Sequence, residues 1–341
     1  MNIKRIGLSL FTLLLLYKPV IALELAAENC MLDAFNKLPE KTTIGEIRKL
    51  CSTPEIQTIE THEQLVEIEK TSLGIVKERM QIDKSNVLKP FTLMSHHQNY
   101  FLLAVHNFNG WGTTEIEKLA DNDKINLDNT EAQFQLSIKT PLAVNILGSS
   151  IDLYGAYTLR SFWQVYNSKS SSPFRESNHE PGAWLQMPND LEMFGFKNTA
   201  NVLGIVHQSN GQAGSYSRSW NRVYAAFIFE KNNFAFVIKP WFRISEDEED
   251  DDNPDITDYL GHGNLRIAYK QDEHVFSLMS RNNLESGFKR GTIELGWSFP
   301  LFKYDFLKGY VQYFSGYGES LIDYNSYVNH ISFGFLLTDF L

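Results

Sequence analysis

Three polar side chains in one short stretch, His207, Ser209 and Asn221, have the residue types of an activated nucleophile. A serine attacks an ester when a histidine accepts its hydroxyl proton and a third hydrogen-bonding group fixes the tautomer of that histidine. An asparagine can orient the imidazole, although it cannot neutralise the imidazolium as an aspartate does. From the spacing alone, an interfacial histidine with ordinary polar neighbours explains the same residues.

The sequence around these residues predicts two β-strands that bring them together. Residues 203, 205, 207 and 209 share one face of the first strand, and Asn221 lies on the apolar face of the second. A hairpin that turns near Gly214 puts His207 opposite Asn221. We therefore expect all three polar groups on one otherwise apolar face, where polar groups are costly in lipid and need an explanation.

Alternation with a period of two continues from about residue 98 to the C-terminus. Segments of about ten residues with one apolar and one polar face are typical of outer-membrane barrels, whose outer face meets lipid. A large soluble β-sandwich would also alternate. We predict an all-β fold, a transmembrane antiparallel β-barrel of 12 strands, near residues 99–107, 131–142, 151–163, 183–189, 196–211, 219–230, 234–244, 260–270, 274–282, 289–300, 305–316 and 326–340.

The predicted connections give this barrel an orientation. With both termini in the periplasm, the turns at 231–233, 271–273 and 301–304 face inward and are short. The loops at 108–130, 164–182, 211–218, 245–259 and 316–325 face outward and are mostly long. Bacterial barrels show this asymmetry. The strand that carries Ser209 then runs outward, so we expect the serine at the level of the outer leaflet.

The N-terminal part of the chain differs from the barrel. Residues 1–22 are typical of a secretory signal peptide, because a basic start precedes an apolar run shorter than a membrane-spanning helix. Residues 23–83 are expected to form a small, partly helical periplasmic extension, followed by the barrel over 84–341. Cys30 and Cys51 lie in this extension, and the oxidising export compartment favours a disulfide between them over two free thiols.

The charge distribution limits the classes of partner. The 341-residue chain has a net charge of -10, and no nucleic-acid partner is expected, because binding phosphates requires clustered Lys and Arg. The acidic residues concentrate in the run 246–252. This run is either a solvated outer loop or a segment that gathers divalent ions.

The segments 207–211 (His-Gln-Ser-Asn-Gly) and 217–222 (Ser-Arg-Ser-Trp-Asn-Arg) resemble the active-site hairpin of the outer membrane phospholipase A family. The resemblance extends over long motifs from roughly residue 130 to the C-terminus, at 171–176, 239–241, 251–257 and 315–325. It does not include the N-terminal segment with the two cysteines. Members of this family are twelve-stranded barrels that hydrolyse phospholipid acyl esters, need calcium and are activated by dimerisation in the membrane.

The resemblance implies a role for each matching residue. Ser209 would be the nucleophile, His207 the general base and Asn221 its orienting partner, and the backbone amide of Gly211 would help to hold the oxyanion.

The resemblance also implies calcium ligands. They are the hydroxyl of Ser217, the backbone carbonyl of Gln212 and Ser171 of the other subunit, while Asp252 matches a position associated with a secondary calcium site. Such oxygen donors suit calcium. The segment between Gln212 and Ser217 lacks the acidic residue that the family commonly has there.

We therefore expect a calcium-dependent outer-membrane phospholipase with A1, A2 and lysophospholipase activity. It would act on membrane phospholipids as a homodimer and remove phospholipids mislocalised to the outer leaflet. The alternative is a non-catalytic outer-membrane channel or porin-like barrel, which would not need a Ser, His and Asn on its lipid face. A surface protease would instead have its catalytic groups in the water-filled mouth of the barrel.

Overall fold

The computed structural model describes residues 74–87, 89, 92–111, 127–247, 249, 251–283, 286–301 and 304–341. The chain divides into two compact units, 1–72 and 73–341, and all the described residues belong to the second. The expected signal peptide and the expected Cys30–Cys51 disulfide lie outside the described residues.

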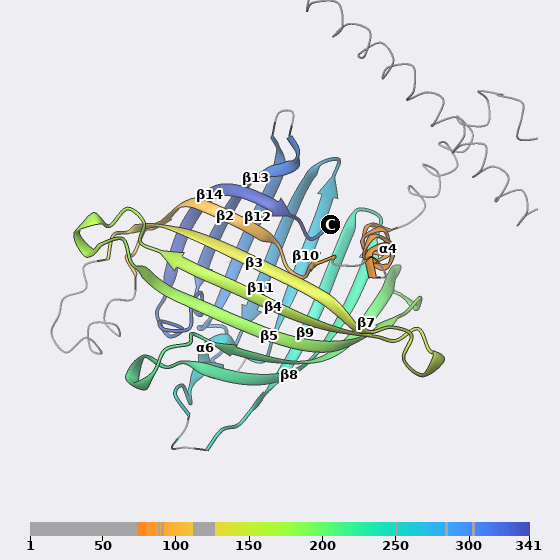
Figure 1. The fold of residues 1–341 in the computed structure, drawn as a ribbon, viewed down its shortest axis with the longest axis horizontal. Coiled ribbons are helices and arrows are strands. Elements are labelled where there is room, and N and C mark those ends of the chain that lie inside the picture. Colours follow the sequence, from red (N-terminus) through yellow and green to blue (C-terminus); the bar gives the residue numbers. More distant parts are fainter. Residues whose placement is uncertain are drawn as a thin grey trace, which may run out of the picture. The chain divides into compact units, whose positions relative to one another are not determined.

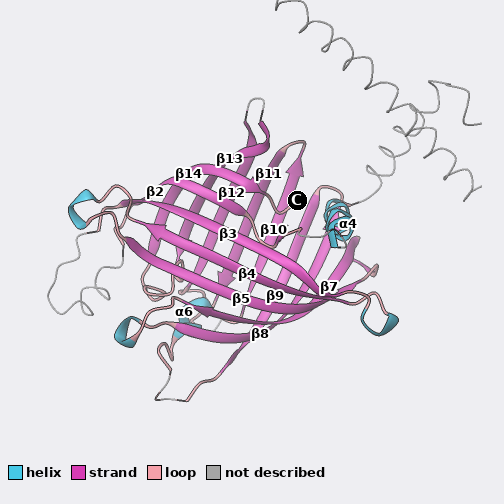
Figure 2. Cartoon of the chain, in the orientation of Figure 1, coloured by secondary structure: helices cyan, strands magenta, loops and turns pink. Residues whose placement is uncertain are grey.

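Within the described residues, twelve long antiparallel strands close into a barrel (Figures 1 and 2). Each strand pairs with its neighbours in chain order, and the last strand pairs with the first, His330 opposite Asn107. The prediction of a twelve-stranded antiparallel barrel is confirmed. The strands are β2 (Asn99–Asn107), β3 (Thr130–Ala143), β4 (Asp152–Trp163), β5 (Phe174–Pro188), β7 (Phe196–Ser209), β8 (Ser219–Lys231), β9 (Phe234–Ile244), β10 (Gly263–Gln271), β11 (His274–Asn282), β12 (Gly291–Leu301), β13 (Tyr304–Gly316) and β14 (Val328–Thr338).

Several short elements connect or flank the barrel strands. They are the two-residue strands β1 (Met94–Ser95) and β6 (Glu192–Met193), the helices α4 (Ile75–Val87) and α6 (Ile256–Leu260), and the 3-10 turns η1 (Ile146–Gly148), η2 (Ser168–Ser170) and η3 (Gly214–Tyr216). None of the described helices is both long and apolar enough to span a bilayer.

The side chains alternate between the two faces of the barrel wall as the sequence predicts. In β3, Leu136 and Ile138 are exposed on the outside, whereas Ser137 between them is fully buried. In β12, Ile293 and Leu295 are exposed in the same way. The outer face is therefore an apolar surface suited to lipid, and the polar face points into the barrel.

Eleven of the predicted strands agree with the structure to within three residues at each end, but the fourth does not. The prediction of a strand over 183–189 is wrong at its start, because β5 begins at Phe174. The missing half carries polar side chains on both faces, with Asn178 buried inside and Ser177 and His179 on the other face, so the apolar alternation that marks a strand is absent there.

Helix α4 packs on the end of the barrel where the chain also terminates (Figure 1). The backbone amide of Val76 donates to Glu230 at 2.7 Å, and Lys139 of the barrel wall pairs with Asp83 of the helix at 2.5 Å. The helix thus crosses the expected boundary at residue 83, and its residues Val76 and Asp83, before that boundary, contact the barrel.

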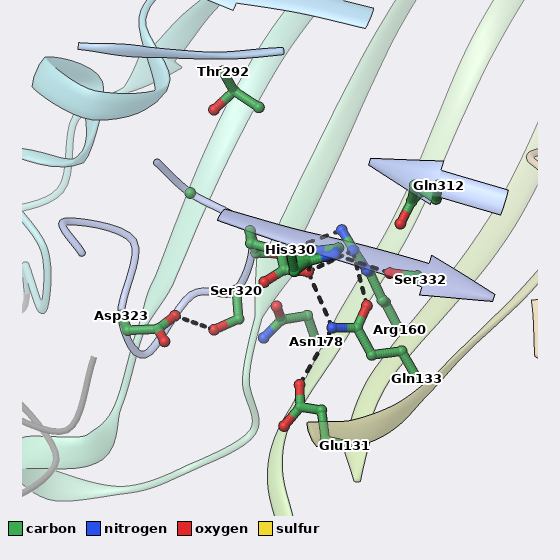
Figure 3. A network of polar contacts seen from close by, with 12 residues as sticks. Glu131, Gln133, Arg160, Asn178, Thr292, Gln312, Ser320, Asp323, His330 and Ser332 are labelled. Atoms are coloured by element: carbon green, nitrogen blue, oxygen red, sulfur yellow. Dashed lines mark hydrogen bonds and ion pairs between the residues drawn. The ribbon is translucent and has the colours of Figure 1, made fainter. Parts of the chain in front are cut away.

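The opposite end of the barrel interior is filled by a polar network, part of which is drawn in Figure 3. Arg175 forms ion pairs with Glu131 at 3.0 Å and with Asp323 at 2.9 Å, and all three side chains are buried. The guanidinium also lies over the ring of Trp111, 4.3 Å from its centroid. These contacts hold the loop between β13 and β14 inside the barrel.

Glu319 of the same loop is a second centre of this network. It contacts His330 at 2.6 Å, Gln133 at 3.0 Å and Arg160 at 3.2 Å. Burial alone raises the pKa of Glu319, but His330, Arg160 and Arg175 outweigh it and lower this pKa to about 2. Because charged groups are paired across the interior at this end, the described barrel is packed there rather than lined by rings of unpaired charge as a wide pore would be.

Candidate active site

The site is built on the hairpin of β7 and β8. His207 is paired directly with Asn221 in the register of these strands, and Ser209 is paired with Ser219. The predicted pairing of residues 207 and 221 is confirmed. The ring of His207 lies 2.9 Å from Asn221, measured from Nδ1 to Oδ1.

These three residues face outward. Leu203 and Ile205, which share their face of β7, are 51% and 58% exposed, whereas Val206, which lies between Ile205 and His207, points inward and is buried. Val223, two residues beyond Asn221 on β8, is also exposed. A serine, a histidine and an asparagine therefore lie on an apolar outer surface, where a lipid tail can reach them and a water-soluble substrate in the barrel mouth cannot.

The inward face of the same hairpin makes it rigid. Gln208 accepts hydrogen bonds from Trp220 at 2.9 Å and from Arg222 at 3.1 Å inside the barrel. Arg222 in turn pairs with Glu180 at 2.9 Å. Since successive residues of a strand alternate between faces, fixing Gln208 also fixes the positions of His207 and Ser209.

Among the described residues, the Ser209 side chain makes no hydrogen bond, so the structure pairs the histidine with the asparagine but does not join the serine to the histidine. Hydrogen bonds of catalytic groups are often long without substrate and tighten when substrate binds. The Ser209 hydroxyl can change its position by rotation about the Cα–Cβ bond alone.

The turn after Ser209 contains Gly211, whose backbone amide lies two residues along the chain from the serine. Gly211 adopts a left-handed conformation with φ of 66°, which favours glycine. Asn210 is buried and pins the turn, because its side-chain amide donates to the Tyr216 carbonyl at 2.8 Å and its side-chain carbonyl accepts from the Arg218 amide at 3.0 Å. The Gly211 amide is thus held by contacts on both sides of the turn.

The acidic loop after β9 contacts the chain just before and at the start of β8. Three alternate positions of the chain each receive a partner from it: Ser217 donates to Asp252 at 2.5 Å, the Ser219 amide to Asn253 at 2.9 Å, and the Asn221 side chain to Glu246 at 2.8 Å.

An ion pair of Arg243 with Asp251 at 2.5 Å braces the loop from the end of β9. Glu246 and Asp251 are therefore partly buried, whereas Asp247, Glu249 and Asp252 of the same run are exposed to solvent.

The residues expected to hold calcium are partly brought together. A hydroxyl and a carboxylate meet at Ser217 and Asp252, which is the all-oxygen donor chemistry that calcium prefers. Ser171 lies in the loop between β4 and β5, is exposed, and has a left-handed φ of 59°. Within the described residues no group of three or more His, Cys, Asp or Glu side chains gathers as a metal site. The expected set relies on serine hydroxyl and backbone carbonyl oxygens instead.

Sequence reasoning missed two residues of this site. Glu246 belongs to the acidic run, whose composition gives no sign that one member reaches Asn221. His179 of β5 is paired with Ser209 across the strand and has the Tyr157 hydroxyl 2.6 Å from its Nδ1. Its ring also lies 3.7 Å from the point where a Cβ on Gly211 would stand. His179 was expected to have an ordinary loop or rim role, because its half of β5 was assigned to a loop.

The fold and site together define an outer-membrane β-barrel with a hydrolase-like constellation on its lipid-facing side. Comparison with known proteins gives the family. The profile of the phospholipase A1 family matches residues 76–337. The chain is 38% identical to phospholipase A1 of Klebsiella pneumoniae over 253 residues, 73% of this chain and 84% of that protein. It is equally identical to phospholipase A1 of Escherichia coli strain K12, over 73% and 83% of the two chains.

Solved structures agree with this assignment. The outer membrane phospholipase A of Escherichia coli is similar with a TM-score of 0.69 and 37% identity, covering 75% of this chain and 97% of that one. The crystal structure of the Salmonella typhi outer membrane phospholipase dimer with bound calcium is similar with a TM-score of 0.68 and 38% identity, covering 74% and 94%. The chain therefore belongs to the phospholipase A1 family and is an outer-membrane β-barrel enzyme.

Proposed function

We propose that this protein is a calcium-dependent phospholipase that hydrolyses acyl ester bonds of membrane phospholipids and lysophospholipids with Ser209, His207 and Asn221. The observation that carries the proposal is the register of β7 and β8. It pairs His207 with Asn221, two residues from a serine, on the apolar outer face of the barrel. A Ser-His pair oriented by an amide suits acyl transfer, and its apolar setting suits a lipid substrate.

The roles follow from the proton movements. His207 accepts the Ser209 hydroxyl proton at Nε2 as the oxygen attacks the ester carbonyl carbon, and Asn221 holds the ring through Nδ1. The Gly211 amide donates to the oxyanion that forms. His207 then returns the proton to the leaving alcohol. Water, activated by the same ring, releases the fatty acid and regenerates Ser209.

Calcium is part of this proposal because the expected ligands are all oxygen donors. The Ser217 hydroxyl and the Gln212 carbonyl, together with Ser171 of the partner subunit, would hold the ion, and Asp252 is close enough to Ser217 to add a carboxylate. A bound cation beside the ester lowers the cost of the developing negative charge. The relative with bound calcium from Salmonella typhi supports this assignment.

Activation by dimerisation follows from the position of the site. The nucleophile faces lipid, so one barrel alone offers an open apolar surface with no second wall. A second barrel would form a groove for the acyl chain and contribute the exposed Ser171. The Salmonella typhi relative is a dimer, which supports this step.

The expected position of the site at the depth of the outer leaflet suggests the proposed role in the cell. The outer leaflet of such a membrane holds mainly lipopolysaccharide, so phospholipid substrate is scarce there until membrane asymmetry is lost. The enzyme would then remove phospholipids mislocalised to the outer leaflet. A channel is the second candidate, but the paired charges around Arg175 and Glu319 that fill the outer end of the barrel disfavour it.

The decisive experiment measures fatty-acid release from phospholipid by the purified protein in detergent, with calcium or with chelator. The Ser209→Ala variant is expected to lose release completely. Ser219→Ala removes the hydroxyl of the cross-strand partner of Ser209 and serves as the matched control, which should keep release. Release that persists in Ser209→Ala, or that ignores chelation, would contradict the proposal.

A mixing experiment tests the dimer. Ser209→Ala and Ser171→Ala subunits are each inactive or weak alone, but a heterodimer of the two has one complete site. An equal mixture is then expected to recover roughly a quarter of the parent's activity, because half of the dimers are mixed and each has one working site of two. No recovery in a mixture shown by cross-linking to contain heterodimers would refute the contribution of Ser171.

A further inference from the structure

The Asn221 side chain contacts both His207 and Glu246, and the contact with Glu246 determines which hydrogen-bonding role His207 can take. Its Oδ1 is 2.9 Å from Nδ1 of His207, and its Nδ2 donates to Oε1 of Glu246 at 2.8 Å. Glu246 follows β9, whose last residue, Ile244, is paired with Asn221 across the sheet. The carboxylate therefore reaches Asn221 from the strand next to β8, on the side opposite His207.

The chemistry of the two ends of the amide makes this contact directional. A side-chain amide can rotate to present either its oxygen or its NH2 group to a given neighbour. An ionised carboxylate can only accept hydrogen bonds, so the NH2 group of Asn221 must face Glu246 and the oxygen must face His207. Nδ1 of His207 must then carry the proton, which leaves Nε2 free to accept the proton of Ser209.

Glu246 also supplies what an asparagine lacks. The imidazolium that forms during attack gains no counter-charge from a neutral amide. The Glu246 carboxylate accepts a hydrogen bond from the other end of the Asn221 amide, so a negative charge joins the line of contacting side chains that ends at His207. Glu246 is half-buried, and the contacts of Asp252 and Asn253 with Ser217 and Ser219 hold its loop on β8.

We propose that Glu246 is a positioning residue that fixes the orientation of the Asn221 amide and thereby the tautomer of His207. This inference rests on the proposed function, since it concerns the same site. Glu246 does not contact the substrate and acts only through Asn221. Its neighbour Asp247 is exposed and provides the matched control, because Asp247→Asn removes the same charge from the adjacent position of the loop.

The kinetic test uses Glu246→Gln, whose side chain has a donor and an acceptor end and no charge. Loss of a charged hydrogen bond of this kind is expected to lower kcat about 10-fold to 100-fold with KM nearly unchanged, because substrate contacts are intact. Asp247→Asn should keep the parent's kcat. An unaltered kcat in Glu246→Gln would overturn the proposal.

A double substitution separates positioning from a merely structural role. Asn221→Asp alone sets two carboxylates at hydrogen-bonding distance, so repulsion should lower kcat strongly. In combination with Glu246→Gln, the new carboxylate can accept from both the glutamine amide and His207. The double variant is therefore expected to exceed both single variants by about tenfold. If Glu246 merely anchors the loop, the two losses multiply instead, and that result would overturn the proposal.

A spectroscopic measurement makes the test independent of turnover. Nitrogen NMR of histidine-labelled protein in detergent at about pH 8.5, where imidazoles are neutral, reports which ring nitrogen carries the proton. The His207 signals are assigned by their absence in His207→Gln. The parent should show a single tautomer with the proton on Nδ1, and Glu246→Gln a mixture. The same single tautomer in both would refute the inference even if hydrolysis is established, whereas a tautomer change in a protein without hydrolytic activity would refute only the proposed function.

Discussion

Alanine at Gly211 tests whether the backbone amide of this residue acts in catalysis. Gly211 has a φ of 66°, and a Cβ there would meet nothing closer than the His179 ring at 3.7 Å. The substitution therefore costs only the left-handed conformation, about 1–2 kcal/mol for an L-residue with a side chain. The chain can relieve this strain by rotating the adjoining peptide, and that rotation moves the amide away from the serine.

Gly214 is the matched control, because it lies in the same hairpin loop with a φ of 61° and open space around it. Gly214→Ala should cost the same stability, since its conformational penalty is the same. Its amide is not assigned to the oxyanion, so kcat should change less than about twofold. Removing one oxyanion donor costs about 100-fold to 1,000-fold in kcat, and a displaced amide in Gly211→Ala should cost at least about tenfold.

The assay combines two measurements on each variant. Urea unfolding in detergent micelles gives the loss of stability, and initial rates of fatty-acid release at saturating calcium give kcat. The reasoning is refuted if both alanine variants lose stability equally and also lose kcat equally, because the rate loss would then come from strain in the loop. It is also refuted if Gly211→Ala keeps the parent's kcat.

Three further predictions concern a proposed calcium ligand and the barrel interior. Asp252→Asn should raise the calcium concentration for half-maximal activity several-fold at unchanged kcat, as measured by calcium titration of hydrolysis. Arg175→Met leaves two buried carboxylates, Glu131 and Asp323, without their ion-pair partner and should lower the free energy of unfolding by about 3–5 kcal/mol in urea, whereas a small loss would contradict the pairing. Because the pKa of Glu319 is lowered to about 2 from 4.5, its stabilising contribution is complete above pH 4.5 and is lost as the pH falls towards 2. The urea concentration at the unfolding midpoint should therefore fall more steeply with decreasing pH for the parent than for Glu319→Gln.

The barrel could be predicted from the sequence because a membrane barrel imposes one simple pattern. Lipid on one side and a polar interior on the other force alternation in almost every strand, as in 132–139. The exception is β5, where the first half carries polar residues on both faces. Ser177 and His179 are polar on the outer side because this part of the wall adjoins the site. The apolar alternation is therefore interrupted beside the candidate site, where His179 pairs with Ser209.

The candidate site was predictable only as far as strand geometry reaches. A turn near Gly214 is enough to pair His207 with Asn221, because hairpin register follows from the turn. The partners contributed by other segments were not predictable. Glu246 is one of several acidic residues in its run, and nothing in the composition distinguishes the one that reaches Asn221. His179 becomes a neighbour of Ser209 only through the pairing of β5 with β7, which requires the true start of β5.

The use of an amide in place of an aspartate fits the location of the site. A carboxylate at position 221 would lie on the lipid-facing wall, where a charge is costly unless it is fully paired. Asn221 is neutral and can remain there at lower cost, while the charge resides on Glu246, in a loop beyond the end of β9. Under the proposed mechanism, the amide carries the influence of that charge to His207, and the ionised group itself stays near the water-exposed rim. A lipid-facing hydrolase thus obtains an oriented base without leaving a bare carboxylate in the lipid.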